Sequence, residues 1–286
     1  MTLPPFDLHR PRSLEEATAL AERYGEDAAF YCGGTELLLL LKLGFASFGQ
    51  LIDLKGVEEL VGVRAEDGCL VVGAAVTHRE LERSELVRER LPALAAMERH
   101  VANLRVREVG TLGGNLCFSD PHSDPATFLL ALDAEVEYRR GGDAARRAPI
   151  SDFVVGPYQT ILHEGEVLTS VPIPELPPGS AVAHSKFAFH ERPTATVACL
   201  VRVVEGEVAE ARVAVGSVGA RPARAPAAEQ MLTGAPAKEI GNGQLAEAGE
   251  RAAEAAAPVD DATGSAEYKA QLVRVLVERT FREAVA

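Results

Sequence analysis

The 286-residue sequence lacks the features of several protein classes. No unbroken apolar run is longer than Leu37–Leu41, which is far short of the ~20 residues that span a membrane. The N-terminus has no basic patch before an apolar segment, so no signal peptide is indicated and we expect a cytoplasmic protein. Lysine and arginine number 29 against 42 aspartate and glutamate residues, which argues against a nucleic-acid or membrane-surface partner.

Cysteine is also scarce. The four cysteines, at positions 32, 69, 117 and 199, form no Cys-x-x-Cys pair, and no Cys/His cluster has the spacing of a zinc or iron–sulfur site. We therefore expect free thiols and no metal bound by this chain, so that any redox chemistry would need an organic cofactor. The Gly-x-Gly-x-x-Gly fingerprint, the P-loop, a catalytic triad and the Gly-x-Ser-x-Gly pattern are missing too, which disfavours a nicotinamide-type Rossmann site.

What remains is an ordinary soluble composition, 47% hydrophobic and 25% charged, in a chain long enough for about two domains. Five of the eight residues in Pro172–Gly179 are proline or glycine, so no regular element is expected to cross this stretch. We predict one domain over residues 1–176, with lobes of about 1–57 and 58–176, and a second over residues 177–286. Strands followed by helices predict an α+β fold for the second domain.

Local patterns predict the main elements. Ser13 with Glu16 forms a capping box before a helix, and Thr77 is the predicted N-cap of another. Asp124 is predicted to cap a helix that starts at Pro125. The leucine-rich helix over residues 36–43 is too apolar for a solvent-facing helix. It is a candidate partner surface, but we expect it in the core. Further strands are predicted at 28–32, 51–54, 68–76, 135–139, 197–204 and 207–218, and further helices near 92–100 and at 225–232, 244–257 and 268–284.

A glycine pair, Gly33 and Gly34, stands between a predicted strand and the leucine-rich helix. Paired glycines allow positive φ and a close approach of another group to the backbone. Successive N–H groups there attract anions such as a diphosphate, and Thr35 can add a hydroxyl donor. Glu36 is awkward beside a phosphate, and we expect its side chain to turn away. A plain strand-to-helix turn explains the same residues.

A second turn contains Gly113, Gly114 and Asn115. Asparagine tolerates left-handed backbone, so this turn suits an outward-facing group of N–H donors. Two such turns could hold the two phosphates of one dinucleotide from both sides. Asp124 could accept hydrogen bonds from a ribose diol, although a helix cap explains it as well. Lys186 could meet a flavin carbonyl or phosphate, or be a solvated lysine on an edge strand.

Taken together, these segments resemble the FAD-binding medium subunit of molybdenum hydroxylases, the family that includes aerobic carbon monoxide dehydrogenase and xanthine dehydrogenase. The resemblance covers nearly the whole chain, in matching order and spacing. The segments that carry it are Cys32–Glu36, Arg107–Asn115, Ser119–Pro125, Gly156–Tyr158, Leu168–Pro174, Lys186–Phe187 and Gly216–Arg224.

The resemblance implies an α+β chain: a two-lobed FAD domain of the vanillyl-alcohol-oxidase kind, followed by a smaller α+β domain that covers the flavin. Asp124 would bind a ribose, Val101 would lie against the adenine, and Lys186 would approach the isoalloxazine. FAD would be bound non-covalently. The residues implied to hold its pyrophosphate are Cys32, Gly33, Gly34, Thr35, Glu36, Thr111, Leu112, Gly113, Gly114 and Asn115.

The resemblance also implies partners. A large subunit would carry molybdopterin cytosine dinucleotide and a small subunit two [2Fe–2S] clusters, in a dimer of heterotrimers, with FAD passing electrons to a final acceptor. Some members place a tyrosine against the flavin where this chain has Arg192-Pro193-Thr194, so aromatic stacking is in doubt there. Two alternatives remain open: a structural subunit of the same fold without FAD, and a free-standing FAD oxidoreductase.

Overall fold

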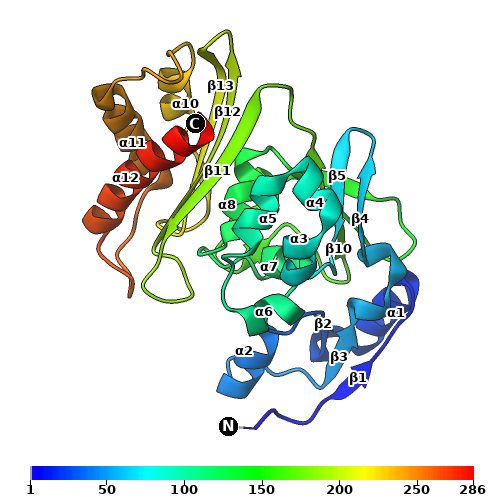
Figure 1. Ribbon diagram of the computed structural model, residues 1–286. Helices are drawn as coiled ribbons and strands as arrows, with labels where there is room; N and C mark the ends of the chain where they lie inside the picture. Colours follow the sequence, from blue (N-terminus) through cyan, green and yellow to red (C-terminus); the bar gives the residue numbers. More distant parts are fainter. Residues whose placement is uncertain (1) are drawn as a thin grey trace.

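The computed structural model describes residues 2–286, and its first lobe, coloured blue in Figure 1, is a parallel sheet with strand order β1-β3-β2. Helix α1 packs on this sheet because Leu14, Ala17 and Ala21 form one buried apolar face. Ser13 caps the helix as predicted, because its hydroxyl accepts from the N–H of Glu16. The capping box is not complete, since the Glu16 carboxylate accepts from the N–H of Arg12 and not from that of Ser13. The elements are β1 (Asp7–His9), α1 (Leu14–Tyr24), β2 (Ala28–Tyr31), α2 (Leu37–Leu43) and β3 (Gln50–Asp53).

The second lobe is an antiparallel sheet with strand order β4-β5-β10-β6-β7, packed against helices. Thr77 caps α3 through a complete capping box with Glu80, as predicted. The elements are β4 (Val63–Glu66), β5 (Cys69–Gly73), α3 (His78–Arg83), α4 (Glu85–Arg90), α5 (Pro92–Glu98), α6 (Leu104–Val109), α7 (Leu112–Phe118), α8 (Asp124–Ala131), β6 (Glu135–Arg139), β7 (Arg146–Pro149), α9 (Ile150–Phe153), the β8–β9 pair (Val154–Gly156 and Gln159–Thr160) and β10 (Val167–Pro174).

Strand β10 corrects one expectation, because it runs into the proline-rich stretch that was expected to hold no regular element. Pro172 pairs with Val71 and Pro174 with Cys69, both on β5. On its other side β10 pairs with β6 only from Val167 to Ser170. The prolines therefore lie where that side of the strand has no neighbour, and their missing N–H groups cost no ladder hydrogen bond there.

The C-terminal part is an antiparallel sheet with strand order β11-β12-β13-β14 and three helices, drawn in yellow to red in Figure 1. The predicted hairpin is present, and its turn residues Glu205 and Gly206 both have positive φ, as a tight hairpin turn requires. The elements are β11 (Ser180–Phe187), β12 (Ala195–Val204), β13 (Glu207–Gly216), β14 (Ala223–Arg224), α10 (Pro226–Leu232), α11 (Asn242–Ala256) and α12 (Ala266–Ala284).

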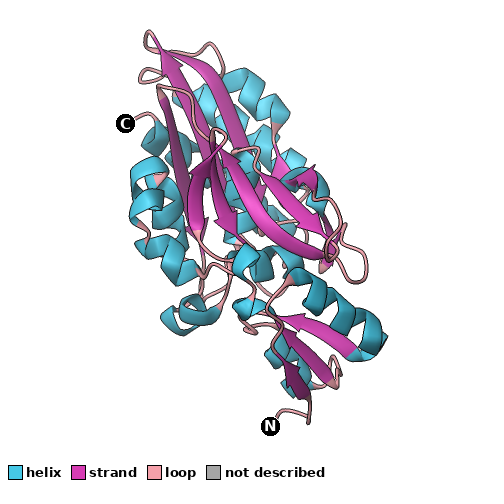
Figure 2. Cartoon of the chain, turned by 90° about the vertical axis from the view of Figure 1, so that its right-hand side faces the viewer, coloured by secondary structure: helices cyan, strands magenta, loops and turns pink. Residues whose placement is uncertain are grey.

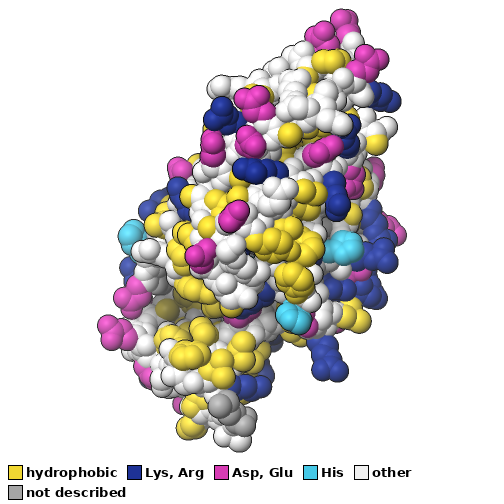
Figure 3. Space-filling view, turned by 90° about the vertical axis from the view of Figure 1, so that its left-hand side faces the viewer, with side chains coloured by type: hydrophobic (Ala, Val, Ile, Leu, Met, Phe, Trp, Pro, Cys, Tyr) yellow, Lys and Arg dark blue, Asp and Glu magenta, His cyan; other side chains and the backbone are white. Residues whose placement is uncertain are grey.

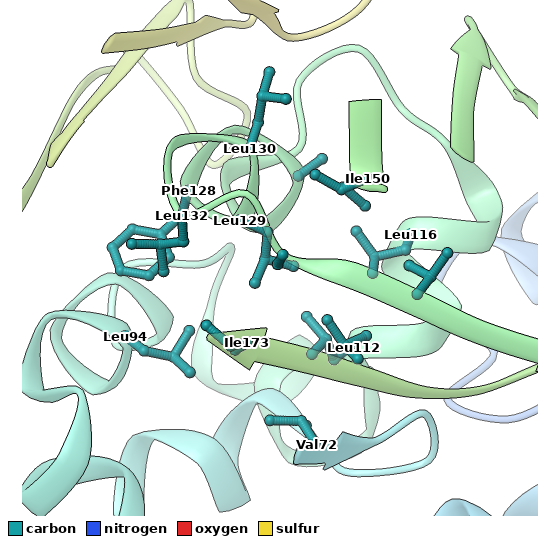
Figure 4. Packing of buried hydrophobic residues seen from close by; sticks show 14 of the residues in the cluster. Val72, Leu94, Leu112, Leu116, Phe128, Leu129, Leu130, Leu132, Ile150 and Ile173 are labelled. Carbon is teal, nitrogen blue, oxygen red and sulfur yellow. The ribbon is translucent and has the colours of Figure 1, made fainter. Parts of the chain in front are cut away.

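The C-terminal sheet has helices on both of its faces (Figure 2). Alternate residues of β12 point to opposite faces. Ala198 and Leu200 join the core of the second lobe, whereas Val197 and Cys199 join a separate core under α11 and α12. Figure 4 shows part of the second-lobe core around α8 and β10. The predicted α+β architecture is confirmed, and no helix among residues 2–286 has the length and apolarity to cross a membrane.

Helix α2 is not a core helix, contrary to expectation. Of its residues only Leu41 is buried, at 3% exposure, while Leu39 and Leu43 are exposed and Phe45 just beyond the helix is 77% exposed. Figure 3 shows hydrophobic side chains gathered on this lowest part of the molecule. A run of leucines indicates that a helix is apolar on all sides, but it does not indicate what covers those sides.

Candidate cofactor-binding site

A cavity of about 380 Å³ lies where the first lobe, the second lobe and the loop after β11 meet. Its volume is in the range of ~300–1,000 Å³ that is usual for small-molecule sites. Both glycine-rich turns reach it, although they are far apart in sequence. The predicted site residues that line it are Cys32, Gly33, Gly34, Thr35, Glu36, Val101, Thr111, Gly113, Gly114, Asn115 and Asp124.

Two predicted site residues are outside this lining. Leu112 is fully buried in the core of the second lobe, and its N–H donates to the main-chain oxygen of Val76 over 3.0 Å. Lys186 contacts the lining residue Asp124 instead of the cavity itself. The Leu112 side chain therefore packs in the core, and its N–H is already paired.

The first turn has the geometry that the sequence predicts. Gly34 has a φ of +70°, a left-handed conformation that places its N–H and those of its neighbours away from the strand. The main-chain N–H groups of Gly34, Thr35 and Glu36 have no acceptor among the residues that the structure describes. Residues 34–36 are half-buried on the cavity wall, and three consecutive donors without a protein acceptor suit an anion there.

Gly33 has a different function in the same turn. A Cβ at this position would lie 2.3 Å from the main-chain oxygen of Val109 and 2.6 Å from the Cα of Gly110. The two lobes therefore touch here through bare backbone. Only glycine permits this approach, which brings the first turn up to the segment that leads into α7.

The second turn differs from the prediction. Residues 112–118 form α7, and Thr111 caps it by accepting from the N–H of Gly114 over 3.1 Å. The N–H of Gly113 donates to the oxygen of Ala74, and that of Asn115 to the oxygen of Thr111. The expected outward-facing group of N–H donors is therefore wrong for this turn, because a capped helix start has already paired them. Gly113 instead allows close packing, since a Cβ there would lie 2.6 Å from the oxygen of Ala74.

Asp124 was predicted to cap α8, but the structure shows that it does not. Ser123 caps the helix by accepting from the N–H of Ala126, which leaves the Asp124 carboxylate free for other contacts. Lys186 Nζ donates to Asp124 Oδ2 over 2.8 Å, whereas Asp124 Oδ1 is buried and has no hydrogen-bond partner among the described residues. Asp124 lines the cavity, but its Oδ1 is covered and lies 3.7 Å from Nε2 of His184, a residue outside the lining.

Lys186 lies close to the segment that contains Val101. Lys186 Nζ also donates to the main-chain oxygen of His100 over 2.5 Å, which places Lys186 next to the residue that precedes Val101. The adenine contact expected of Val101 and the isoalloxazine contact expected of Lys186 stay predictions.

Buried His184 lies beside this ion pair, with Nε2 3.7 Å from Asp124 Oδ1. Burial lowers the pKa of His184 to about 4, against an opposing effect of the Asp124 charge. Between about pH 4 and pH 6.5, the His184 ring is therefore neutral in the folded chain but protonated in the unfolded chain, whose histidine pKa is 6.5.

We expect this difference to make stability depend on pH. The neutral His184 ring contributes fully to the free energy of unfolding above pH 6.5. This contribution, about 3 kcal/mol in total, is lost as the pH falls from 6.5 to about 4. Denaturant unfolding of wild type and of His184→Gln across this range measures it. The free energy of unfolding should depend less steeply on pH in the variant than in wild type. An equal pH dependence in the two proteins would contradict the assignment.

Sequence reasoning missed the role of Arg192, which joins three parts of the chain. Its Nη2 lies 3.1 Å from Asp120 Oδ2 in the second lobe and 3.3 Å from Glu36 Oε2 in the first. Burial alone would raise the pKa of Asp120, but hydrogen bonds from His122 and the charge of Arg192 lower it below its ordinary value. The loop after β11 is therefore held across the cavity, and Glu36 is turned toward a cation.

Comparison with known proteins agrees with this geometry. The family described as "FAD binding domain in molybdopterin dehydrogenase" matches residues 4–176, which is more than half of the chain. The chain belongs to this family. The CO dehydrogenase flavoprotein C-terminal domain matches residues 183–284, so both halves are typical of the medium chains of molybdenum hydroxylases.

Relatives of the family match over their whole length. The carbon monoxide dehydrogenase medium chain of Hydrogenophaga pseudoflava is 33% identical over 292 residues, covering 100% of this chain and 99% of the relative. The putative xanthine dehydrogenase FAD-binding subunit of Escherichia coli is 32% identical, covering 97% and 95%. A solved carbon monoxide dehydrogenase from H. pseudoflava superposes with a TM-score of 0.94 at 33% identity, covering 99% of this chain and 98% of that one. These relatives are subunits of oxidoreductase complexes.

Proposed function

We propose that the chain binds FAD non-covalently in the cavity and acts as the electron-transfer medium subunit of a molybdenum hydroxylase. The observation that carries this proposal is the row of three unpaired N–H groups at Gly34, Thr35 and Glu36 on one cavity wall. A diphosphate would supply the acceptors that these donors lack. Asp124, which lines the same cavity, would supply a carboxylate to a ribose hydroxyl of the cofactor.

The residues of the site then have separate tasks. The N–H groups at positions 34–36 hold the diphosphate, and Gly114 leaves room for it on the opposite wall. Lys186 keeps a positive charge close to the end where the flavin ring would lie, and Arg192 holds the loop after β11 over the site. FAD accepts electrons singly or in pairs, which suits a link between one-electron clusters and a two-electron acceptor.

The remaining chemistry belongs to other chains in this proposal. A large subunit carries molybdopterin cytosine dinucleotide, where substrate is oxidised, and a small subunit carries the [2Fe–2S] clusters, in a dimer of heterotrimers in the cytoplasm. Exposed apolar side chains support a contact with a partner beside the cavity: Leu39 and Leu43 of α2, and Phe45 just beyond it. Mass spectrometry of the chains that co-purify with this one tests the assembly. Isolation of the chain alone, active without partners, would support a free-standing oxidoreductase instead.

FAD binding is tested by Gly114→Val. A Cβ at Gly114 would lie 2.9 Å from Thr111 Oγ1, the acceptor that caps α7, and would meet nothing else within 4 Å. The cap must therefore shift, while the rest of the side chain has room on the cavity side. We expect wild type to release one FAD per chain on acid extraction, and the variant to release almost none while its cofactor-free form loses about 1 kcal/mol of stability, the usual cost of a disturbed helix cap.

The matched control is Gly243→Val, another helical glycine whose Cβ would meet nothing within 4 Å. It should keep its FAD. A Gly114→Val protein with a full complement of FAD would show that this wall does not face the cofactor. Wild type without FAD would favour the structural subunit.

A further inference from the structure

A buried histidine on the cavity wall, His78, is paired with a buried glutamate outside the lining, Glu98, and neither was predicted from the sequence. His78 is 2% exposed and Glu98 is fully buried, and His78 Nδ1 lies 2.7 Å from Glu98 Oε2. Glu98 Oε1 has no hydrogen-bond partner, and no other cation lies within ion-pair distance of this carboxylate among residues 2–286. His78 lines the cavity, and its Nε2 makes no hydrogen bond to a described residue.

A neutral ring that donates from Nδ1 to an ionised Glu98 would leave Nε2 as an acceptor, but charge balance disfavours this arrangement. A buried carboxylate without a compensating charge is costly, so the pair is expected to carry no net charge. Two arrangements satisfy this: an imidazolium beside a carboxylate, or a neutral ring beside a protonated carboxyl that donates to Nδ1. In both of them Nε2 carries a proton. His78 therefore presents an N–H donor on the side of the ring opposite Glu98.

The position of the ring indicates what this donor meets. The His78 N–H donates to the oxygen of Gly110, and the ring Cδ2, next to Nε2, lies 3.3 Å from where a Gly110 Cβ would be. Thr35 Cγ2 lies 3.5 Å from the same point. The imidazole and the turn with unpaired N–H groups are thus neighbours on the cavity wall. The described lining contains five carboxylates (Glu36, Asp120, Asp124, Glu166 and Glu191) but one arginine, so an anion needs further donors.

We propose that His78 Nε2–H is a further hydrogen-bond donor to the diphosphate of the bound dinucleotide, and that Glu98 is the positioning residue that keeps the proton on Nε2. This inference rests on the proposed function. It extends the phosphate site from the first turn to the start of α3, and joins the two lobes through the ligand.

The test compares two unbranched replacements, His78→Gln and His78→Met, in the complete complex after removal of its cofactor. Both fill a similar volume, but only glutamine retains an N–H donor. We expect His78→Met to raise the Kd for FAD and for ADP by about tenfold to a hundredfold, the usual range for a hydrogen bond to a charged group. Riboflavin, which has no diphosphate, should bind as in wild type. His78→Gln should recover most of the loss, and Glu98→Gln should fall between it and His78→Met.

Thermal unfolding of each cofactor-free variant separates loss of the donor from loss of the fold, and His163→Gln, an exposed histidine outside the lining, is the control. Equal FAD and ADP affinities in His78→Met and wild type would overturn the proposal while leaving FAD binding intact. Weaker riboflavin binding with unchanged ADP binding would overturn it as well, because the contact would then be with the flavin portion. Wild type that binds no FAD would contradict this proposal and the proposed function together.

Discussion

Gly33→Val is expected to abolish FAD binding and to lower the free energy of unfolding by about 3 kcal/mol or more. The new Cβ would lie 2.3 Å from the oxygen of Val109 and 2.6 Å from the Cα of Gly110, and both are backbone atoms that cannot rotate away. The lobes must then separate at the point where they meet, which displaces the donors at Gly34 and Thr35 from the opposite wall. Acid extraction measures the cofactor, and denaturant unfolding measures the stability.

Gly156→Val serves as the control, because a Cβ on this glycine would meet nothing within 4 Å and its φ is not left-handed. It should retain both FAD and stability. If Gly33→Val unfolded like wild type with its FAD in place, the contact between the two lobes would not be the tight one described above.

Lys186→Met is expected to cost about 3 kcal/mol of stability, the lower end of the ~3–5 kcal/mol for breaking a buried ion pair, since Lys186 is partly exposed. Methionine keeps most of the side-chain length but removes the charge, so Asp124 stays buried with no cation. In wild type, burial and the Lys186 charge lower the pKa of His184 to about 4, so the ring supplies no charge to Asp124 while Lys186 is present. Chemical unfolding of the cofactor-free protein measures the loss.

A double variant isolates the pair from other effects. Asp124→Asn removes the stranded charge, so Lys186→Met with Asp124→Asn should be more stable than Lys186→Met alone. Lys238→Met, at an exposed position, should change the stability by less than about 0.5 kcal/mol. A Lys186→Met protein as stable as the Lys238→Met control would show that the pair contributes nothing to the fold.

Local chemistry explains which features were predictable. Ser13 and Thr77 cap their helices with a glutamate three residues later, a pattern that depends on the neighbouring residues alone. The same kind of reasoning chose Asp124 over Ser123 as the cap of α8, because both residue types are good caps and the sequence does not rank neighbours. The motif of the second turn correctly indicated a cavity wall, but two of its N–H groups, those of Leu112 and Gly113, are paired with Val76 and Ala74, which are distant in sequence. The other two are paired with the helix cap, Thr111.

Long-range partners explain the rest. Lys186 meets Asp124 across 62 positions, and Arg192 meets Glu36 across 156, so no local pattern signals either pair. The pairing of His78 with Glu98 was equally hidden, although a histidine directly after a helix cap is a signal that could have prompted the question. The exposure of α2 was misjudged because apolar composition alone does not distinguish a core from a surface that another chain covers.

The C-terminal sheet has one practical consequence. Its strands supply side chains to two cores at once, Ala198, Leu200 and Ala214 on one face and Val197 and Cys199 on the other. Producing the two halves separately would expose an apolar strand face and helix α8 to water. Each half would then aggregate or bind the other half. The gene can be divided there only if both products are made together.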